Sequence, residues 1–162
     1  NRKCQGYFIA LGANDIALGS SYIGTVDDIN INDFTQNNDT FCGNYARIIG
    51  EIKAVQSKAK IFLMTIPKPY TTGSNNEVCL SLNEAIRTIS SMFDNCYLLD
   101  LANDDFITSE IINTHNRNSH YDSVFYNLMG MHIAELTSKY MYLNQSEFLE
   151  VEFIGTDYSW TE

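Results

Sequence analysis

The chain has 162 residues, of which 44% are hydrophobic, and this length and apolar content are typical of one globular domain. Its 10 Lys and Arg residues against 20 Asp and Glu residues give a formal net charge of -10, which argues against a nucleic acid or an anionic membrane as a partner. No apolar run reaches the roughly 20 residues that a membrane-spanning helix needs, so we expect no membrane span.

The first half of the chain predicts a strand, a long loop and a helix. The apolar run 7–11 stops at Gly12, as expected for a strand that is buried on both faces. Residues 13–41 are rich in Asn, Asp, Gly, Ser and Thr, which favour turns, and a loop of this length usually lies near a functional site. Residues 44–58 predict an amphipathic helix, whose apolar side chains recur at three- and four-residue steps: Tyr45, Ile48, Ile49, Ile52 and Val55.

The second half continues this alternation of strands and helices. Unbroken apolar runs predict strands at 60–66, where Pro67 ends the strand, and at 96–101. Between them, apolar residues at helical spacing predict a helix over about 80–93. The Asn-rich residues 103–120 are expected to be irregular.

The chain ends in a long helix and an aromatic tail. We expect the helix over about 123–142, with Ser123 as a cap of its first turn. The tail 145–160 is too aromatic for a freely moving end, so we expect it to dock on the body of the domain. The expected inward face of the helix consists of Val124, Leu128, Met131 and Leu136.

Strands and helices in alternation predict an α/β sandwich, in which helices cover both faces of a parallel sheet. No linker divides the chain, so we expect a single domain over residues 1–162. Ligands bind to such sheets at the carboxyl ends of the strands. Three segments are expected to meet there: residues 12–15, residues 67–70 and the region of His120.

The cysteines do not indicate a metal site. Their positions give neither a C-x-x-C pair nor a Cys/His cluster with the spacing of zinc ligands, so we expect ordinary thiols. No Gly-rich phosphate-binding loop is present, and no metal or organic cofactor is implied. The cysteines concerned are Cys4, Cys42, Cys79 and Cys96.

Asn14 is the first candidate for chemistry, in the string Gly12-Ala13-Asn14-Asp15 that follows the first strand. A strand end can hold an amide side chain rigidly, so that Asn14 would donate hydrogen bonds to a developing oxyanion. Gly12 would let the backbone and a substrate approach each other closely. The alternative is a simple turn, because Asn and Asp are common turn formers after a strand.

His120 is the second candidate, directly before the last helix. Imidazole has an ordinary pKa near 6.5, so it can accept a serine proton and return it to a leaving group near neutral pH. The alternative is a solvated histidine or a helix cap. His115 and His132 are expected to be structural or exposed.

These segments, in this order over nearly the whole chain, resemble the SGNH (GDSL) hydrolase family. The resemblance implies a three-layer α/β/α sandwich of the flavodoxin-like SGNH type and hydrolysis of an ester through an acyl-serine intermediate. It also implies Asn14 and Gly12 in the oxyanion hole and His120 as the general base. A small ester or an acylated carbohydrate would be the substrate.

Two departures from the family pattern qualify this expectation. No Gly-Asp-Ser segment precedes Tyr7, so the nucleophile and the first strand are expected on a missing amino-terminal segment or a second chain, and this chain alone is expected to be inactive. Arg117 stands three residues before His120, where the family has an aspartate. Asp122, Asn118 or a backbone carbonyl remain candidates for the group that orients the imidazole.

Two other functions stay open at this point. Arg117 at the aspartate position would suit a non-catalytic carbohydrate- or partner-binding domain that kept the fold. A flavodoxin-like nucleotide- or signal-binding domain has the same order of elements, but its phosphate-binding loop is missing from the sequence.

Overall fold

Three parallel strands form the centre of the molecule, in the order β1-β2-β3. A computed structural model describes residues 4, 6–67, 74–117 and 120–148 of the chain. Side-chain pairs along the sheet include Phe8 opposite Phe62 and Phe62 opposite Tyr97. The strands are β1 (Gly6–Ile9), β2 (Lys60–Met64) and β3 (Cys96–Leu99).

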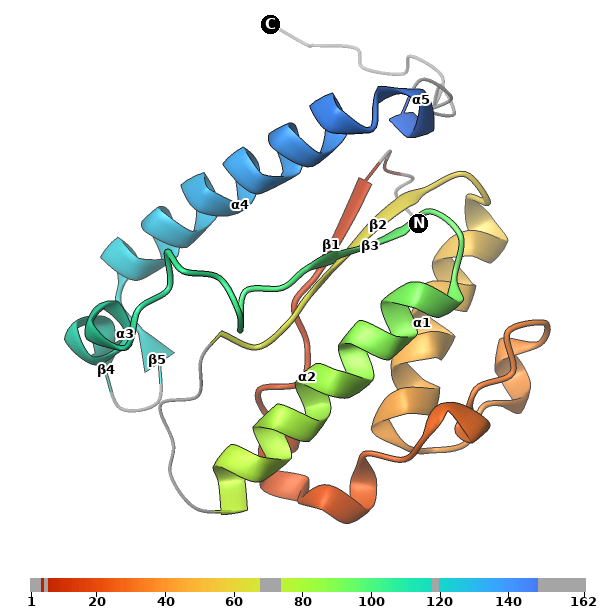
Figure 1. Ribbon diagram of the computed structural model, residues 1–162. Helices are drawn as coiled ribbons and strands as arrows, with labels where there is room; N and C mark the ends of the chain where they lie inside the picture. The colour runs from red at the N-terminus through yellow and green to blue at the C-terminus, as the bar shows by residue number, and fades with distance from the viewer. Residues whose placement is uncertain (1–3, 5, 68–73, 118–119, 149–162) are drawn as a thin grey trace, which may run out of the picture.

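Helices cover both faces of this sheet, as Figure 1 shows with α4 on one side and α1 and α2 on the other. The helices are α1 (Phe41–Val55), α2 (Ser74–Met92), α3 (Ser109–His115), α4 (Ser123–Leu143) and α5 (Gln145–Phe148). The expectation of a mixed α/β fold with a parallel sheet is therefore confirmed for the described residues.

A hydrophobic core lies on each face of the sheet, and the central strand β2 contributes side chains to both of them, because successive side chains of a strand point to opposite faces. Ile61 and Leu63 are fully buried in a cluster with residues of α1 and α2. Phe62 and Met64 face the other way, into a cluster with residues of α3 and α4. All five residues of β2 are buried, which explains why the sequence from Ile61 to Met64 is apolar.

Two helices begin earlier than their apolar spacing predicts. Helix α1 starts at Phe41 because the Thr40 side chain caps it, accepting a hydrogen bond from the backbone N–H of Gly43. Helix α2 starts at Ser74, several residues before the first apolar residue of its stripe. The polar first turn of α2 carries no apolar periodicity, whereas α1 begins with the buried Phe41 and Cys42, and the Thr40 cap marks its start.

The segment 103–120 is more regular than we expect from its composition. It contains α3, capped by Thr108, and the first strand of a short antiparallel hairpin. The two strands of that hairpin are β4 (Asn116–Arg117) and β5 (His120–Tyr121). The expectation of an irregular passage is wrong there, because strands of two residues give no alternating pattern to detect.

The expected cap and inward face of α4 also need correction. Asp122, and not Ser123, is the N-cap, because its side chain accepts a hydrogen bond from the Phe125 N–H at 3.0 Å. Val124 and Met131 are 52% and 73% exposed. Leu136 packs against the core as expected, together with the partly buried Ile133 and the buried Phe125 and Met129, which the prediction did not include.

The start of the aromatic tail packs on the sheet as expected. The Phe148 ring lies 6.3 Å from the Phe62 ring and 5.1 Å from the Tyr97 ring, centroid to centroid. The rest of the tail, residues 149–160, lies outside the described residues. Of the loop 67–70, the described part is Pro67.

Candidate functional site

A cavity of about 330 Å³ lies where the three strands end, at the edge of the sheet where ligands are expected. Its wall is formed by the residues that follow β1, β2 and β3, by β5 and by one side of α4. Nearly all of these side chains are apolar: Ala10, Leu11, Ala13, Met64, Thr65, Ile66, Pro67, Leu101, Tyr121, Phe125, Tyr126, Met129 and Ile133.

Gly12 shapes the loop at one side of this cavity. Its φ of 113° lies in the region that favours glycine. A Cβ atom at this position would also lie 3.3 Å from Ile66 Cδ1 and 3.3 Å from Phe41 Cε2. The backbone conformation therefore favours glycine, and a Cβ atom would in addition be in tight contact with two side chains.

Asn14 lies on the turn that Gly12 begins. The Asp15 N–H donates to the Gly12 carbonyl at 3.0 Å, and Asn14 is the residue before the 3₁₀ turn η1 (Asp15–Leu18). The Asn14 side chain is exposed and does not cap this turn. The backbone of Asn14 forms part of a turn, as the alternative interpretation predicts, while its side-chain amide remains available to a ligand.

Hydrogen bonds from α2 and β3 fix the end of β2 next to this loop. Asn83, which is fully buried, accepts from the Ile66 N–H at 2.8 Å and donates to the Ile66 carbonyl at 3.0 Å. Thr65 Oγ1 donates to Asp100 Oδ1 at 3.0 Å, and Arg87 forms two hydrogen bonds with the same carboxylate, both at 2.9 Å. The rim of the cavity is thus held by neighbouring elements.

Asp100 is the charged centre of this network. Burial raises its pKa, but hydrogen bonds from Arg87, Thr65 and Asn103 together outweigh that effect and leave the pKa below its ordinary value. The carboxylate therefore stays ionised at neutral pH and serves the scaffold of the rim.

His120 is the first residue of β5. Its side chain is exposed, and its backbone pairs with Arg117 across the hairpin. Tyr121 lines the cavity and stacks on Phe125 with ring centroids 3.9 Å apart. The neighbours of both candidates, Ala13 and Tyr121, thus line the same cavity.

His115 has a carboxylate partner at the start of α4. Its Nδ1 lies 3.0 and 3.1 Å from the two carboxylate oxygens of Asp122, and the Asp122 N–H donates to the His115 carbonyl. The sequence analysis missed this pair because the hairpin that joins the two residues has no periodic signal. Of the candidates for orienting His120, Asp122 contacts His115, and Asn118 lies outside the described residues.

His132 has a structural environment, as expected. Its Nε2 lies 2.9 Å from Asp104 Oδ2, and its ring stacks on Phe106 with centroids 4.2 Å apart. The side chain is 11% exposed, so it takes part in packing α4 against the segment before α3.

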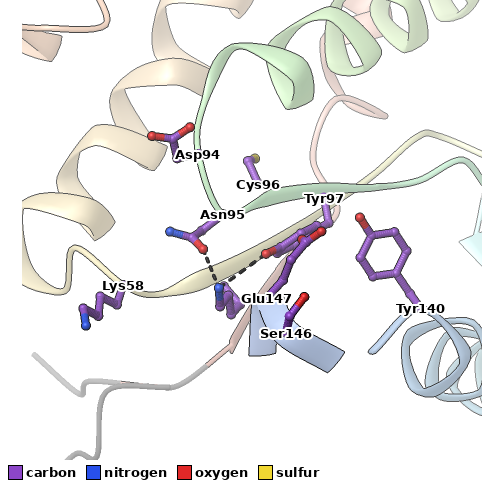
Figure 2. Close-up of a pocket in the computed structure, with 9 residues that line it drawn as sticks. Lys58, Asp94, Asn95, Cys96, Tyr97, Tyr140, Ser146 and Glu147 are labelled. Carbon is purple, nitrogen blue, oxygen red and sulfur yellow. Dashed lines mark hydrogen bonds between the residues drawn. The ribbon is translucent and has the colours of Figure 1, made fainter. Parts of the chain in front are cut away.

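A second hollow, of about 630 Å³, lies at the opposite edge of the sheet, where β2 and β3 begin. Figure 2 shows its wall, which includes Asn95, Tyr97 and Glu147, and Lys60 also lines it. Lys60 is 7% exposed and donates to Asn95 Oδ1 and, at 3.4 Å, to the Tyr97 hydroxyl. Burial, with a contribution from Glu147, raises the pKa of Tyr97 to about 12.

The buried Lys60 ammonium therefore has hydrogen-bond partners within the protein. The larger hollow also lies far from both candidate segments. The smaller cavity is the one on which the Gly12 loop and the His120 hairpin converge. Within the described residues, no cluster of three His, Cys, Asp or Glu side chains could hold a metal ion.

The four cysteines are free thiols, as expected. Burial raises the pKa of Cys96 to about 12, and burial together with the nearby Asp28 carboxylate raises that of Cys42 to about 11. Neither thiol is positioned to act as a nucleophile at neutral pH.

Comparisons of the chain with protein-family models, with curated proteins and with solved structures gave no match. None of the helices in the described part of the chain is both long and apolar enough to cross a membrane.

Proposed function

We propose that this chain is the carboxyl-terminal part of a serine ester hydrolase related to the SGNH (GDSL) family, with the three-layer α/β/α sandwich of that family. One observation carries the proposal. Ala13, inside the Gly12–Asn14 segment, and Tyr121, next to His120, line one cavity at the carboxyl ends of parallel strands. Two segments that are far apart in sequence thus contribute to the wall of one cavity. The first segment could supply an oxyanion donor and the second a general base.

In this proposal each segment has a distinct role. A serine on a segment outside this sequence attacks the carbonyl of a small ester or an acylated carbohydrate while His120 accepts the serine proton. The Asn14 amide donates to the oxyanion, and the alcohol leaves with the proton from His120. Water then attacks the acyl-serine, releasing the acid and restoring the serine. This chemistry uses protein groups and water alone.

The Asn14 role is tested in the full-length protein with a chromogenic ester such as 4-nitrophenyl butyrate. Asn14→Ala should lower kcat by about 100-fold or more, because a lost oxyanion donor costs that much in other enzymes. Asn32→Ala is the matched control, since Asn32 is an exposed residue of the same long loop. Equal kcat values for the two variants would overturn the assignment.

The base is tested by comparing two histidines. His120→Ala should lower kcat by about 100-fold or more, since general-base catalysis contributes ~10²–10⁴-fold. His115→Ala should lower stability, because His115 joins α3 to the first turn of α4, and should keep most of kcat. The opposite result would move the role of base to the His115–Asp122 pair. No hydrolysis by the full-length protein would favour a non-catalytic carbohydrate- or partner-binding domain.

A further inference from the structure

We propose that the cavity at the carboxyl ends of the strands binds the hydrocarbon chain of the substrate's acyl group, so that the preferred acyl group is an unbranched alkyl chain of medium length. This inference rests on the proposed ester hydrolysis and adds the substrate class. It follows from the composition, shape and position of the cavity.

The wall of the cavity is suited to hydrocarbon and not to a sugar. Alanine, leucine, isoleucine, methionine, proline and aromatic side chains make up nearly all of it. The Thr65 hydroxyl is already engaged, since it donates to Asp100 and accepts from the Ala102 N–H at 2.9 Å. A carbohydrate hydroxyl placed against this wall would meet few groups that could replace its hydrogen bonds to water. An alkyl chain would only lose contact with water, which is favourable.

The shape of the cavity suits an extended chain. Phe125, Met129 and Ile133 follow one another at four-residue steps along α4, so they form a stripe about 12 Å long at 1.5 Å per residue. The residues that follow β1 and β2 form another part of the wall. The volume of about 330 Å³ lies at the small end of the range for ligand pockets.

The position of the cavity connects it to the proposed chemistry. Ala13 and Tyr121, which line the cavity, are the sequence neighbours of Asn14 and His120, so the proposed function puts the ester carbonyl at the rim of this cavity. The alkyl chain therefore extends from that carbonyl along α4.

Binding can be measured on this chain without hydrolysis. The probe is 2-octanone, whose carbonyl replaces the ester carbonyl and which cannot be hydrolysed, with 2-butanone as the short comparison. The readout is the ¹³C-methyl spectrum of methionine-labelled protein. Met64 and Met129 line the cavity, whereas Met131 and Met141 are 73% and 40% exposed and serve as internal controls.

We expect 2-octanone to shift the Met64 and Met129 signals and to leave those of Met131 and Met141 in place. Affinity should rise about four-fold for each methylene added to the ketone, the factor that corresponds to burial of one CH₂. Shifts spread equally over all methionines, no shifts, or equal affinity for the two ketones would overturn the inference.

Variants that fill the cavity complete the test. Ala13→Leu and Ile133→Phe add carbon atoms from opposite walls, and each should weaken 2-octanone binding on the order of ten-fold, the equivalent of one or two lost methylene contacts. Ala17→Leu adds the same atoms as Ala13→Leu at an exposed position outside the cavity, so it should leave affinity unchanged.

The outcomes separate this inference from the proposed function. Ketone binding in this cavity with no ester hydrolysis by the full-length protein would contradict the hydrolase and leave the apolar site standing. Hydrolysis at the same kcat/KM for acetyl and octanoyl esters would leave the hydrolase standing and contradict the acyl-chain site.

Discussion

The backbone conformation of a single residue, Gly12, shapes the loop beside the proposed site. Its positive φ turns the chain out of β1, and its missing side chain leaves room for Ile66 and Phe41. The turn that results carries Asn14 with its amide side chain exposed. The position of the proposed oxyanion donor thus depends on one glycine.

The substitution Gly12→Ala should lower the free energy of unfolding by about 1–3 kcal/mol, the usual cost of holding a residue with a side chain in a sparsely populated backbone region. Gly130→Ala is the contrasting variant, because Gly130 lies inside α4 with open space where its Cβ would be. It should raise stability by about 0.5–1 kcal/mol. Urea denaturation measures both, and equal signs for the two would contradict this reading.

The thiols give a second prediction at this scale. Cys4 is exposed, whereas Cys42 and Cys79 are buried and the pKa values of Cys42 and Cys96 are raised to about 11 and about 12. At pH 8 a thiol reagent such as DTNB should modify Cys4 rapidly and the other three slowly. Rapid modification of all four in the native protein would mean that the core opens readily.

At the scale of elements, Asp122 holds the start of α4 and the hairpin together. Its carboxylate accepts from the Phe125 N–H and contacts His115 Nδ1. Since β5 carries His120 and lies directly before Asp122, this residue also limits the freedom of the proposed base.

The substitution Asp122→Ala should destabilise the protein by about 1–2 kcal/mol, because it removes an N-cap and the partner of His115. Ser123→Ala is the control, since Ser123 is exposed and is not the cap, and it should change stability by less than about 0.5 kcal/mol. Thermal or urea unfolding would show the difference. A larger effect at Ser123 would restore Ser123 as the capping residue.

Much of the fold could be predicted from apolar runs, and the failures have physical reasons. Runs such as 60–66 mark strands that are buried on both faces, and β2 is such a strand. Helix α4 has apolar residues on two neighbouring stripes, so spacing alone does not show whether Val124 or Phe125 faces the core. The hairpin and α3 are too short for any period to appear.

The candidate site was predictable only in part for a similar reason. The segments around Asn14 and His120 follow strand ends or precede a helix, and topology brings their neighbours to one cavity. The pairing of Asp122 with His115 depends on the hairpin, which brings residues seven positions apart into contact. The sequence carries no local signal for it.

At the scale of the whole molecule, Asp100 connects three elements, since Arg87 comes from α2, Thr65 follows β2 and Asp100 itself follows β3. Its pKa is lowered in the folded state. A lowered pKa contributes stability that is present above the unfolded value, about 3.9, and is lost as the pH falls through the folded value.

We therefore expect Asp100→Asn to be less stable than the unsubstituted protein at pH 7, with a difference that shrinks on going to pH 3. Denaturant midpoints at the two pH values measure this change. Asp94→Asn is the control, because Asp94 is exposed and should show little difference at either pH. A difference for Asp100→Asn that grows toward pH 3 would contradict the assigned direction of the pKa shift.

The central claim is that Asn14 and His120 act on one carbonyl at the edge of the sheet, beside the cavity that Ala13 and Tyr121 line. The most direct measurement is a crystal structure of the full-length protein after an alkyl phosphonate has modified its nucleophilic serine. We expect the phosphoryl oxygen to accept a hydrogen bond from Asn14 Nδ2, a ring nitrogen of His120 to lie within about 2.6–3.2 Å of the serine or leaving-group oxygen, and the alkyl chain to follow α4. A phosphonate that touches neither residue, or that lies in the hollow around Lys60, would contradict the account.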